Sequence, residues 1–447
     1  MLLGNDLSRE FLYTIISLGC PKNRVDTEKM MFVMSNGGYS FTESPPDADV
    51  IIINTCAFIE LATEESINTI LDYMEENPDA IMVVAGCLPM RYKAEAAESL
   101  PEVDIFIEPD NMADLPALVD EAMRASGKTK SVSVKGLKQS AIGRLITTPG
   151  YAYLRVSDGC DRKCAYCSIP SIRGRMKSEP PEKLEKEALE LASRGANELI
   201  LVAQDLCSYG IDLKIRNGLE LLLERLNRMD AVSWIRLMYL HPNGFPKGLP
   251  DLIRNSEKIL PYLDIPIQHI SARILKDMKR PWNSDAIKKL FDSVRERVPG
   301  IVLRTTVMVG YPTETDADFR ELSNFIESYQ IERVGVFTYS AEEGSAAFAL
   351  GDPVSTEVKQ ARADEIVEIH SRFLEKRNSS RIGAIEPAIV EGYSEETELL
   401  LQGRLWDQAP EVDGALFITD GNAVAGGIYD VRINECVGTD LFGEIVV

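Results

Sequence analysis

Apolar residues follow two alternating patterns in the N-terminal part of the chain. From about residue 11 to 126, short apolar runs alternate with segments whose apolar positions recur at helical spacing. The runs at 13–18, 50–54 and 80–85 predict strands, and amphipathic segments such as 25–35 predict the helices between them. Because strands that alternate with helices usually form parallel sheets, we expect an α/β domain with a parallel sheet here.

The same alternation returns after the next short polar segment. Six apolar runs predict strands, and helical patterns such as 182–194 and 219–228 separate them. Six strand–helix units predict a partial (β/α)6 barrel of TIM type, in which chemistry takes place at the carboxyl ends of the strands. Residues 356–377 predict one long helix that leaves this barrel. The six predicted strands are 153–156, 199–203, 234–239, 263–267, 302–308 and 334–338.

The pattern changes again near residue 379. Short alternating runs with many glycines predict about five strands, which suit a small antiparallel β-barrel of OB-like type. Residues 127–142 are small, polar and basic, as expected of a linker or an exposed hairpin. A chain of 447 residues has room for two or three domains. We therefore place the domains at 9–127, 143–377 and 379–447.

Composition points to a cytoplasmic protein. Hydrophobic residues make up 45% and charged residues 26% of the chain, which is ordinary for a soluble globular protein. No apolar stretch approaches the roughly 20 residues that span a bilayer, and the N-terminus lacks the features of a signal peptide. Eight cysteines in a chain of this kind indicate metal binding or catalysis rather than a disulfide framework.

The charge balance bears on the partner. The net charge is −22, and the predicted C-terminal barrel carries thirteen acidic residues against three basic ones, a net charge of −10. Proteins that grip nucleic acid need a cationic surface, so naked RNA or DNA is disfavoured as a substrate. An acidic surface favours a basic protein partner instead.

Three cysteines close together in sequence form the strongest chemical signal. Cys160, Cys164 and Cys167 are separated by three residues and then two, in a loop that directly follows the predicted strand 153–156. Iron–sulfur clusters usually take four cysteines, so this loop would leave one iron open for a ligand. A structural zinc ion needs four closed ligands, and a redox disulfide needs only two cysteines. The loop therefore favours a cluster with one open iron.

Three further cysteines follow three predicted strands. Cys20, Cys56 and Cys87 come directly after the runs that end near Leu18, Asn54 and Ala85. The carboxyl ends of parallel strands lie at one edge of a sheet, where ligands bind, so these cysteines should meet. A single cysteine after a strand would be an ordinary small buried residue, but three at the same edge favour a second metal site.

Both sets of cysteines resemble a known family. The Cys-x3-Cys-x2-Cys loop is the signature of radical S-adenosylmethionine (SAM) enzymes. Together with a three-cysteine N-terminal domain and a C-terminal barrel of TRAM type, it resembles the methylthiotransferases over nearly the whole chain. Residues 18–23 and 54–60 resemble the branch that acts on ribosomal protein S-twelve of the small subunit, not the branch that acts on transfer RNA. The resemblance implies a transferase that attaches a methylthio group to the β-carbon of one aspartate.

The resemblance also implies cofactors. Cys160, Cys164 and Cys167 would hold a [4Fe–4S] cluster whose open iron chelates SAM, and reductive cleavage would give a 5′-deoxyadenosyl radical. Cys20, Cys56 and Cys87 would hold a second [4Fe–4S] cluster that carries the sulfur, and a second SAM would supply the methyl group. An external electron donor and a sulfur donor would act as further partners.

Four residues are candidates for binding SAM by the same resemblance. Tyr166 matches an aromatic residue near the adenine. Gln204 and Asp205 stand at the second-strand end where the amino group of SAM binds, although the usual Gly-Gly-Glu is absent. Gly310, in the segment 309–314, matches a glycine that packs along the adenine; a purely structural turn is an equal alternative.

Several other polar residues lie near these motifs without a firm role. Two arginines beyond the cluster loop could orient a carboxylate, but exposure to solvent is their more common state. Two histidines at strand ends and two cysteines outside both sets are expected to be structural. These residues are Arg173, Arg175, His241, His269, Cys207 and Cys436.

Three alternatives remain open from the sequence. A methylthiotransferase acting on adenosine in transfer RNA would share the clusters, but a basic barrel would suit it better. An electron-transfer or scaffold protein would normally close each cluster with four ligands. A zinc-dependent binding module would need a fourth ligand at each site as well.

Overall fold

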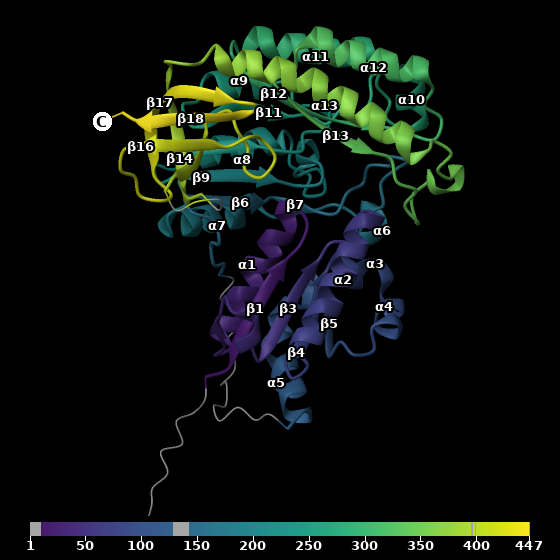
Figure 1. The fold of residues 1–447 in the computed structure, drawn as a ribbon, viewed down its shortest axis with the longest axis vertical. Helices are drawn as coiled ribbons and strands as arrows, with labels where there is room; N and C mark the ends of the chain where they lie inside the picture. The colour runs from purple at the N-terminus through teal and green to yellow at the C-terminus, as the bar shows by residue number, and fades with distance from the viewer. Residues whose placement is uncertain (1–9, 128–142, 395–396, 398, 447) are drawn as a thin grey trace, which may run out of the picture. The chain divides into compact units, whose positions relative to one another are not determined.

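The computed structural model describes residues 10–127, 143–394, 397 and 399–446 (Figure 1). Two compact units divide the chain: the N-terminal unit runs to Thr147 and includes Ser171–Arg173, and the C-terminal unit comprises Thr148–Pro170 and everything from Gly174 onward. Apart from Gly127, the predicted linker 127–142 lies outside the described residues. Within the described part of the chain, no helix is both long and apolar enough to cross a membrane.

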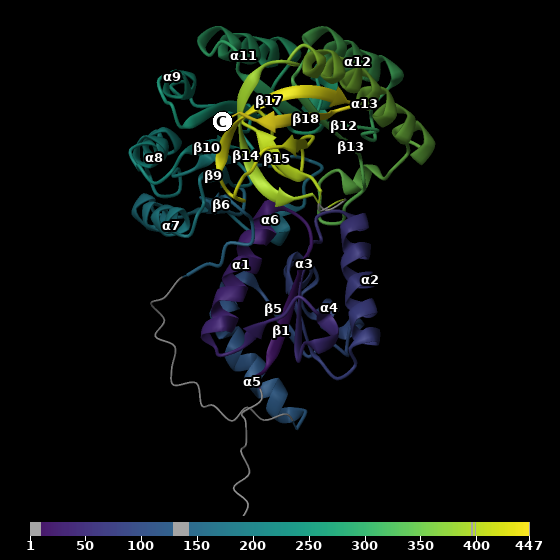
Figure 2. The same ribbon diagram turned by 60° about the vertical axis from the view of Figure 1, so that its left-hand side comes forward.

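The N-terminal unit is built on a five-stranded parallel sheet in the order β2-β1-β3-β4-β5. Every residue of β3 and β4 is buried, because helices cover both faces of the sheet (Figures 1 and 2). The three predicted strands are confirmed as β1, β3 and β4. The strands are β1 (Leu12–Ser17), β2 (Ser40–Phe41), β3 (Val50–Thr55), β4 (Ile81–Gly86) and β5 (Ile105–Ile107).

Two apolar clusters hold helices against this sheet. Helices α1 and α5 cover one face, where Met34 and Val119 pack on Ile52. Helices α2, α3 and α4 cover the other, where Ile70 packs with Ile53. The first helix begins before the predicted residue 25, because Pro21 suits the first helical turn. The helices are α1 (Pro21–Asn36), α2 (Glu60–Glu76), α3 (Cys87–Tyr92), α4 (Ala94–Ser99) and α5 (Leu115–Ala125).

The C-terminal unit contains a six-stranded sheet whose strands follow one another in chain order, all parallel. This order confirms the partial (β/α)6 barrel. The fourth predicted strand, 263–267, was placed too late: β11 ends at Asp264, since Pro266 has no N–H for the strand ladder. The strands are β6 (Tyr151–Arg155), β9 (Glu198–Val202), β10 (Trp234–Leu237), β11 (Ile259–Asp264), β12 (Val302–Val309) and β13 (Arg333–Thr338).

Helices cover the outside of this sheet, and the last of them, α13, is the long helix predicted from the sequence (Figure 1). A short two-stranded ribbon, β7 (Ser157–Asp158) with β8 (Lys177–Ser178), flanks the loop that carries Cys160, Cys164 and Cys167. The helices are α6 (Ile169–Ile172), α7 (Pro181–Ser193), α8 (Gly218–Asn227), α9 (Leu249–Arg254), α10 (Ala272–Asp277), α11 (Ser284–Arg297), α12 (Asp316–Tyr329) and α13 (Thr356–Ser379).

Five strands close the predicted C-terminal barrel in the order β14-β15-β16-β18-β17. Its neighbours are antiparallel except for β16 and β18, which run parallel. An apolar core that includes Val390, Leu416 and Val431 fills the interior. The strands are β14 (Ile385–Tyr393), β15 (Leu401–Leu405), β16 (Leu416–Asp420), β17 (Ile428–Val437) and β18 (Asp440–Ile445).

Many acidic groups of the barrel are engaged inside the C-terminal unit. Asp407 is fully buried among Arg333, Arg377 and Arg381. Asp413 accepts a hydrogen bond of 2.7 Å from the hydroxyl of Tyr262. The charge of −10 therefore overstates the negative surface that the barrel offers to a partner.

A buried ion pair network joins the barrel to the parallel sheet. Glu198 of β9 contacts Arg236 at 2.6 Å and also contacts Arg404 of β15. All three side chains are at most 3% exposed. Burial disfavours the charged form of Glu198, but the two arginines outweigh it and lower the pKa of the carboxyl.

We expect Glu198→Ala to destabilise the C-terminal unit by about 3–5 kcal/mol, because it leaves the buried Arg236 without its paired carboxylate and leaves Arg404 with Glu391 alone. All three tryptophans (Trp234, Trp282 and Trp406) lie in this unit, so tryptophan fluorescence during urea unfolding reports on it. Glu444→Ala is the matched control. It removes a half-exposed pair with Arg432 and should cost about 0.2–1 kcal/mol. Equal losses for both variants would contradict the prediction.

Candidate cluster and cofactor sites

The strand order of the N-terminal unit brings three cysteines to one edge. Cys20, Cys56 and Cys87, here called the N-terminal trio, follow β1, β3 and β4, which are adjacent and parallel. Cys20 immediately precedes α1, and Cys87 is the first residue of α3. The predicted juxtaposition at the carboxyl ends of the strands is therefore present in the fold.

Gly19, the residue before Cys20, packs closely against Cys56. A Cβ placed on Gly19 would lie 2.7 Å from Cys56 Cβ and 3.0 Å from Cys56 Sγ, so only glycine allows this approach at a φ of +90°. Burial raises the pKa of the Cys56 thiol to about 11, and the neighbouring Cys87 and Cys20 add to the rise. The three sulfurs thus share one electrostatic environment.

Two asparagines, not singled out in the sequence, fix the backbone around the N-terminal trio. Asn23 Nδ2 donates to the carbonyls of Leu18 and Thr55, both at 2.9 Å. Asn54 Nδ2 donates to the carbonyl of Asn23 at 2.7 Å. Both asparagines are fully buried, so they hold the ends of β1 and β3 in a fixed relation.

The donor set fits an iron–sulfur cluster better than a single ion. Burying thiolates is costly unless a cationic centre compensates them, and thiolates are the ligands that such clusters use. In the described ranges, no three or more His, Cys, Asp or Glu side chains form a group that could hold one metal ion. A four-iron cluster binds each cysteine through a different iron, so its ligands stand farther apart than those of one ion.

Arg173 is buried, contrary to the expectation of an exposed arginine. Its Nη2 donates to Asn23 Oδ1 at 2.8 Å and to Cys87 Sγ at 3.5 Å, and its Nη1 donates to Asp26 Oδ2 at 3.1 Å. Burial raises the pKa of the Cys87 thiol, and the Arg173 guanidinium opposes that rise. Arg175, in contrast, is 90% exposed.

The second set, Cys160, Cys164 and Cys167, is called the loop trio below. The backbone N–H of Arg162 donates to Cys160 Sγ at 3.4 Å, and the N–H of Cys167 donates to the carbonyl of Cys164 at 3.2 Å. Burial raises the pKa of the Cys167 thiol to about 12, and Cys164 and Cys160 contribute to the rise. The loop therefore gathers its three sulfurs as predicted.

A second buried arginine, which the sequence analysis did not single out, lies beside the loop trio. Arg280 Nη1 lies 3.7 Å from Cys164 Sγ and 3.1 Å from the hydroxyl of Tyr166. Its Nη2 donates to the carbonyl of Pro266 at 2.6 Å. No described carboxylate forms an ion pair with Arg280, so its positive charge stays beside the loop trio.

The four predicted SAM residues have different surroundings. Gln204 Nε2 donates to Asp158 at 2.8 Å, whereas its Oε1 is buried and finds no hydrogen-bond partner in the described residues. A buried free acceptor fits an ammonium group such as that of SAM. Asp205 already accepts a charged hydrogen bond of 2.7 Å from Arg162, so its carboxylate is committed to the cluster loop.

Gly310 has a local reason to be glycine. Its φ is +74°, and a Cβ at this position would overlap the side chain of Lys359. Its N–H and that of Tyr311 both donate to the carboxylate of Glu314. This geometry accounts for the glycine as a structural turn, whether or not adenine packs beside it.

Both histidines accept hydrogen bonds from nearby backbone, as expected of structural residues. His241 Nδ1 accepts from the N–H of Asn243 at 3.1 Å, and His269 Nδ1 accepts from the N–H of Ser271 at 2.9 Å. Burial lowers the pKa of His241 to about 2, helped by Arg280 and Arg162. Burial also lowers the pKa of His269, to about 4, so both rings are neutral.

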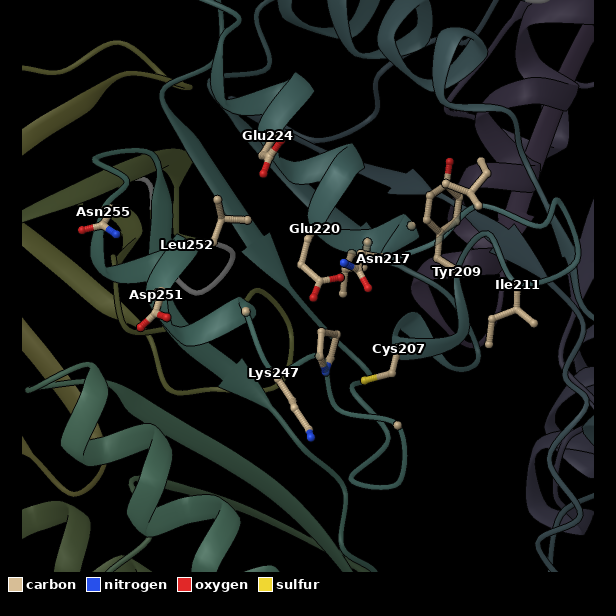
Figure 3. Close-up of a pocket in the computed structure, with 16 residues that line it drawn as sticks. Cys207, Tyr209, Ile211, Asn217, Glu220, Glu224, Lys247, Asp251, Leu252 and Asn255 are labelled. Atoms are coloured by element: carbon tan, nitrogen blue, oxygen red, sulfur yellow. The ribbon is translucent and has the colours of Figure 1, made fainter.

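A cavity of about 670 Å³ opens between the loops that follow β9 and β10 (Figure 3). Its lining includes Cys207, Glu220, Lys247 and Asp251. None of the cysteines of the two trios lines it. Cys207 and Cys436 form no disulfide, and neither do the six cysteines of the two trios.

Comparisons with known proteins show the family to which the chain belongs. Family models match three segments: Uncharacterized protein family UPF0004 at residues 12–108, the radical SAM superfamily at 154–326 and the TRAM domain at 382–446. Among solved structures, the radical SAM methyltransferase TsrM from Kitasatospora setae is 13% identical. The match covers 76% of this chain and 77% of TsrM, with a TM-score of 0.55, and shows a shared fold. Fold and family models together define a radical SAM enzyme, a class that uses SAM and a [4Fe–4S] cluster.

Close relatives narrow this class. The ribosomal protein uS12 methylthiotransferase RimO of Geotalea uraniireducens is 43% identical over 441 residues, which cover 97% of this chain and 98% of the relative. The proteins of the same name from Geobacter sulfurreducens and Aquifex aeolicus are 44% and 40% identical, over 97% and 96% of this chain and 98% and 96% of theirs. The chain belongs to the ribosomal protein uS12 methylthiotransferase family.

Proposed function

We propose that this enzyme attaches a methylthio group to the β-carbon of an aspartate in ribosomal protein uS12. The observation that carries the proposal is the presence of two separate cysteine trios, each one ligand short of closing a four-iron cluster. One open site suits SAM, and the other suits a transferable sulfur. The relatives' name supplies the substrate.

The loop trio would hold the [4Fe–4S] cluster that supplies an electron for SAM cleavage. Gln204 would receive the amino group of SAM at its free Oε1, and Tyr166 would lie beside the adenine. Asp205 would act indirectly by holding Arg162, whose N–H supports Cys160. Gly310 would lie along the adenine through its backbone, because Lys359 fills the space where a Cβ would stand.

The N-terminal trio would hold a second [4Fe–4S] cluster, which supplies the sulfur. Cys56 and Cys87 are buried, so the sulfur would be shielded from water until the substrate arrives. The hydrogen bonds of Asn23 and Asn54 would keep the three cysteine sulfurs in place while the transferable sulfur is lost and replaced. A second SAM would provide the methyl group.

Further partners follow from the chemistry. Reductive cleavage needs an external one-electron donor, and repeated turnover needs a sulfur donor. We place the enzyme in the cytoplasm, where ribosomal proteins are made. The alternative substrate, adenosine in transfer RNA, is disfavoured by the name of the relatives and by the chain's net charge of −22.

A substrate assay tests the proposal. The anaerobically reconstituted enzyme should add a methylthio group to one aspartate of purified uS12, or of uS12 in intact small subunits, in the presence of SAM and reductant. Mass spectrometry of the digested protein measures the modification. Unmodified transfer RNA serves as the competing substrate. Methylthiolation of the RNA and not of the protein would overturn the assignment.

A further inference from the structure

Arg173 and Asp26 form a buried charge pair beside the N-terminal trio. Their closest atoms are 3.1 Å apart, and their side chains are 3% and 0% exposed. The same guanidinium donates to Cys87 Sγ, with an Nη2 to Sγ distance of 3.5 Å. Arg173 therefore contacts a predicted cluster ligand directly, and Asp26 is joined to that ligand through Arg173.

The local packing fixes this arginine. Ile172, which is 4% exposed, packs into the apolar cluster that contains Ile51 and Leu88 of the N-terminal unit. Asn23, which also supports the ends of β1 and β3, accepts the second hydrogen bond from Arg173 Nη2. The guanidinium is thus anchored on both sides and cannot swing away as a surface arginine would.

The charges of the pair have opposite effects on a cluster at Cys87. Hydrogen bonds to cysteine sulfur and nearby net charge set the reduction potential of iron–sulfur clusters. The guanidinium stabilises added negative charge on the cluster and so raises the potential. The Asp26 carboxylate, which accepts from Nη1 of the same guanidinium, opposes this effect. In a buried site both influences are stronger than in water.

The geometry points to a role for this pair: we propose that Arg173 raises, and Asp26 lowers, the reduction potential of the cluster held by Cys20, Cys56 and Cys87. The inference rests on the proposed second cluster. Joining a carbon radical to a sulfide forms one C–S bond and releases one electron. A cation at Cys87 favours uptake of that electron by the iron. Arg173 is thus a positioning residue that acts through Cys87.

The test isolates the second cluster in the full chain. Cys160, Cys164 and Cys167 are all replaced with alanine, and the parent so obtained is reconstituted and titrated against redox mediators by electron paramagnetic resonance. In this parent, Arg173→Gln should shift the midpoint potential to a more negative value, and Asp26→Asn should shift it to a more positive value. Arg173→Lys keeps the charge but loses the forked hydrogen bonds, so its potential should fall between those of the parent and Arg173→Gln.

Arg175→Gln is the matched control, since Arg175 is an exposed arginine two residues away and should leave the potential unchanged. Opposite shifts support the inference, because general loosening of the site would move both variants in the same direction. Unchanged or parallel shifts overturn it. If only one of Arg173→Gln and Asp26→Asn loads iron, that variant decides: an unchanged potential, or a shift opposite to the expected one, overturns the inference. If neither loads iron, a potential of Arg173→Lys above the parent's overturns it.

Iron analysis separates this inference from the proposed function. A parent with about four irons per chain supports the second cluster. A parent without a cluster overturns the second cluster and the inference with it. If the parent holds the cluster but neither Arg173→Gln nor Asp26→Asn changes its potential, the inference is overturned and the proposed function is not.

Discussion

Cys160→Ala should abolish SAM cleavage. The loop would keep two of its three thiolates and would lose the sulfur that accepts the Arg162 N–H at 3.4 Å. We expect the rate of 5′-deoxyadenosine formation to fall at least about a thousandfold, which corresponds to ~4 kcal/mol in the activation free energy. Liquid chromatography with mass spectrometry measures this product under anaerobic conditions with dithionite as reductant.

Cys436→Ala is the control for this loss. Cys436 lies in β17 of the C-terminal barrel, outside both trios, and its replacement should leave the rate within about twofold of that of the unmodified enzyme. Residual cleavage by Cys160→Ala at a rate comparable to that of the control would show that the loop trio does not hold the SAM-cleaving cluster. Iron content should fall by about four atoms per chain in Cys160→Ala and stay constant in Cys436→Ala.

Cys56→Ala should separate the two halves of the reaction. Alanine keeps the Cβ against which Gly19 packs, so the loss of one buried sulfur should cost only about 1 kcal/mol of stability. The variant should lose methylthio transfer to uS12, while SAM cleavage to 5′-deoxyadenosine continues within a few-fold of the normal rate. Parallel mass spectrometry of the protein substrate and of the nucleoside product measures both.

The two products discriminate between models of the second site. Continued methylthio transfer by Cys56→Ala would contradict a sulfur-carrying cluster on the N-terminal trio. Loss of both products together with loss of all iron would indicate that the chain had misfolded, which tryptophan fluorescence and circular dichroism would reveal. Retained cleavage with lost transfer is the expected outcome, because the loop trio belongs to the other compact unit.

Local sequence patterns predicted much of the fold. Helical and alternating periodicity located β1, β3 and β4, and their parallel pairing was enough to bring Cys20, Cys56 and Cys87 to one edge. The partial barrel and the five-stranded C-terminal barrel were likewise predictable, since each depends on a repeated local unit. The spacing of the loop trio needed no tertiary information at all.

Contacts between residues far apart in the sequence were not predicted from the sequence patterns. Arg280 lies 116 residues after Cys164 in the sequence. The residues around Arg280 and those around Cys164 do not indicate that this guanidinium lies beside that sulfur. Arg173 looks like an exposed loop residue until the packing of Ile172 carries it into the N-terminal unit. The end of β11 was misplaced because an apolar run does not show where Pro266 stops the ladder.

The sequence by itself determined that three cysteines follow strands and that three others share one loop, because strand positions and residue spacing can be read along the chain. Only the tertiary structure decided which charges surround those sulfurs. It placed Arg173 with Asp26 at Cys87, and it placed Arg280 beside Cys164, where no carboxylate of the described residues pairs with it. It also paired acidic residues of the barrel, such as Asp407, with arginines inside the C-terminal unit. Electrostatic environment depends on distance in space and on burial, and neither can be read from positions along the chain.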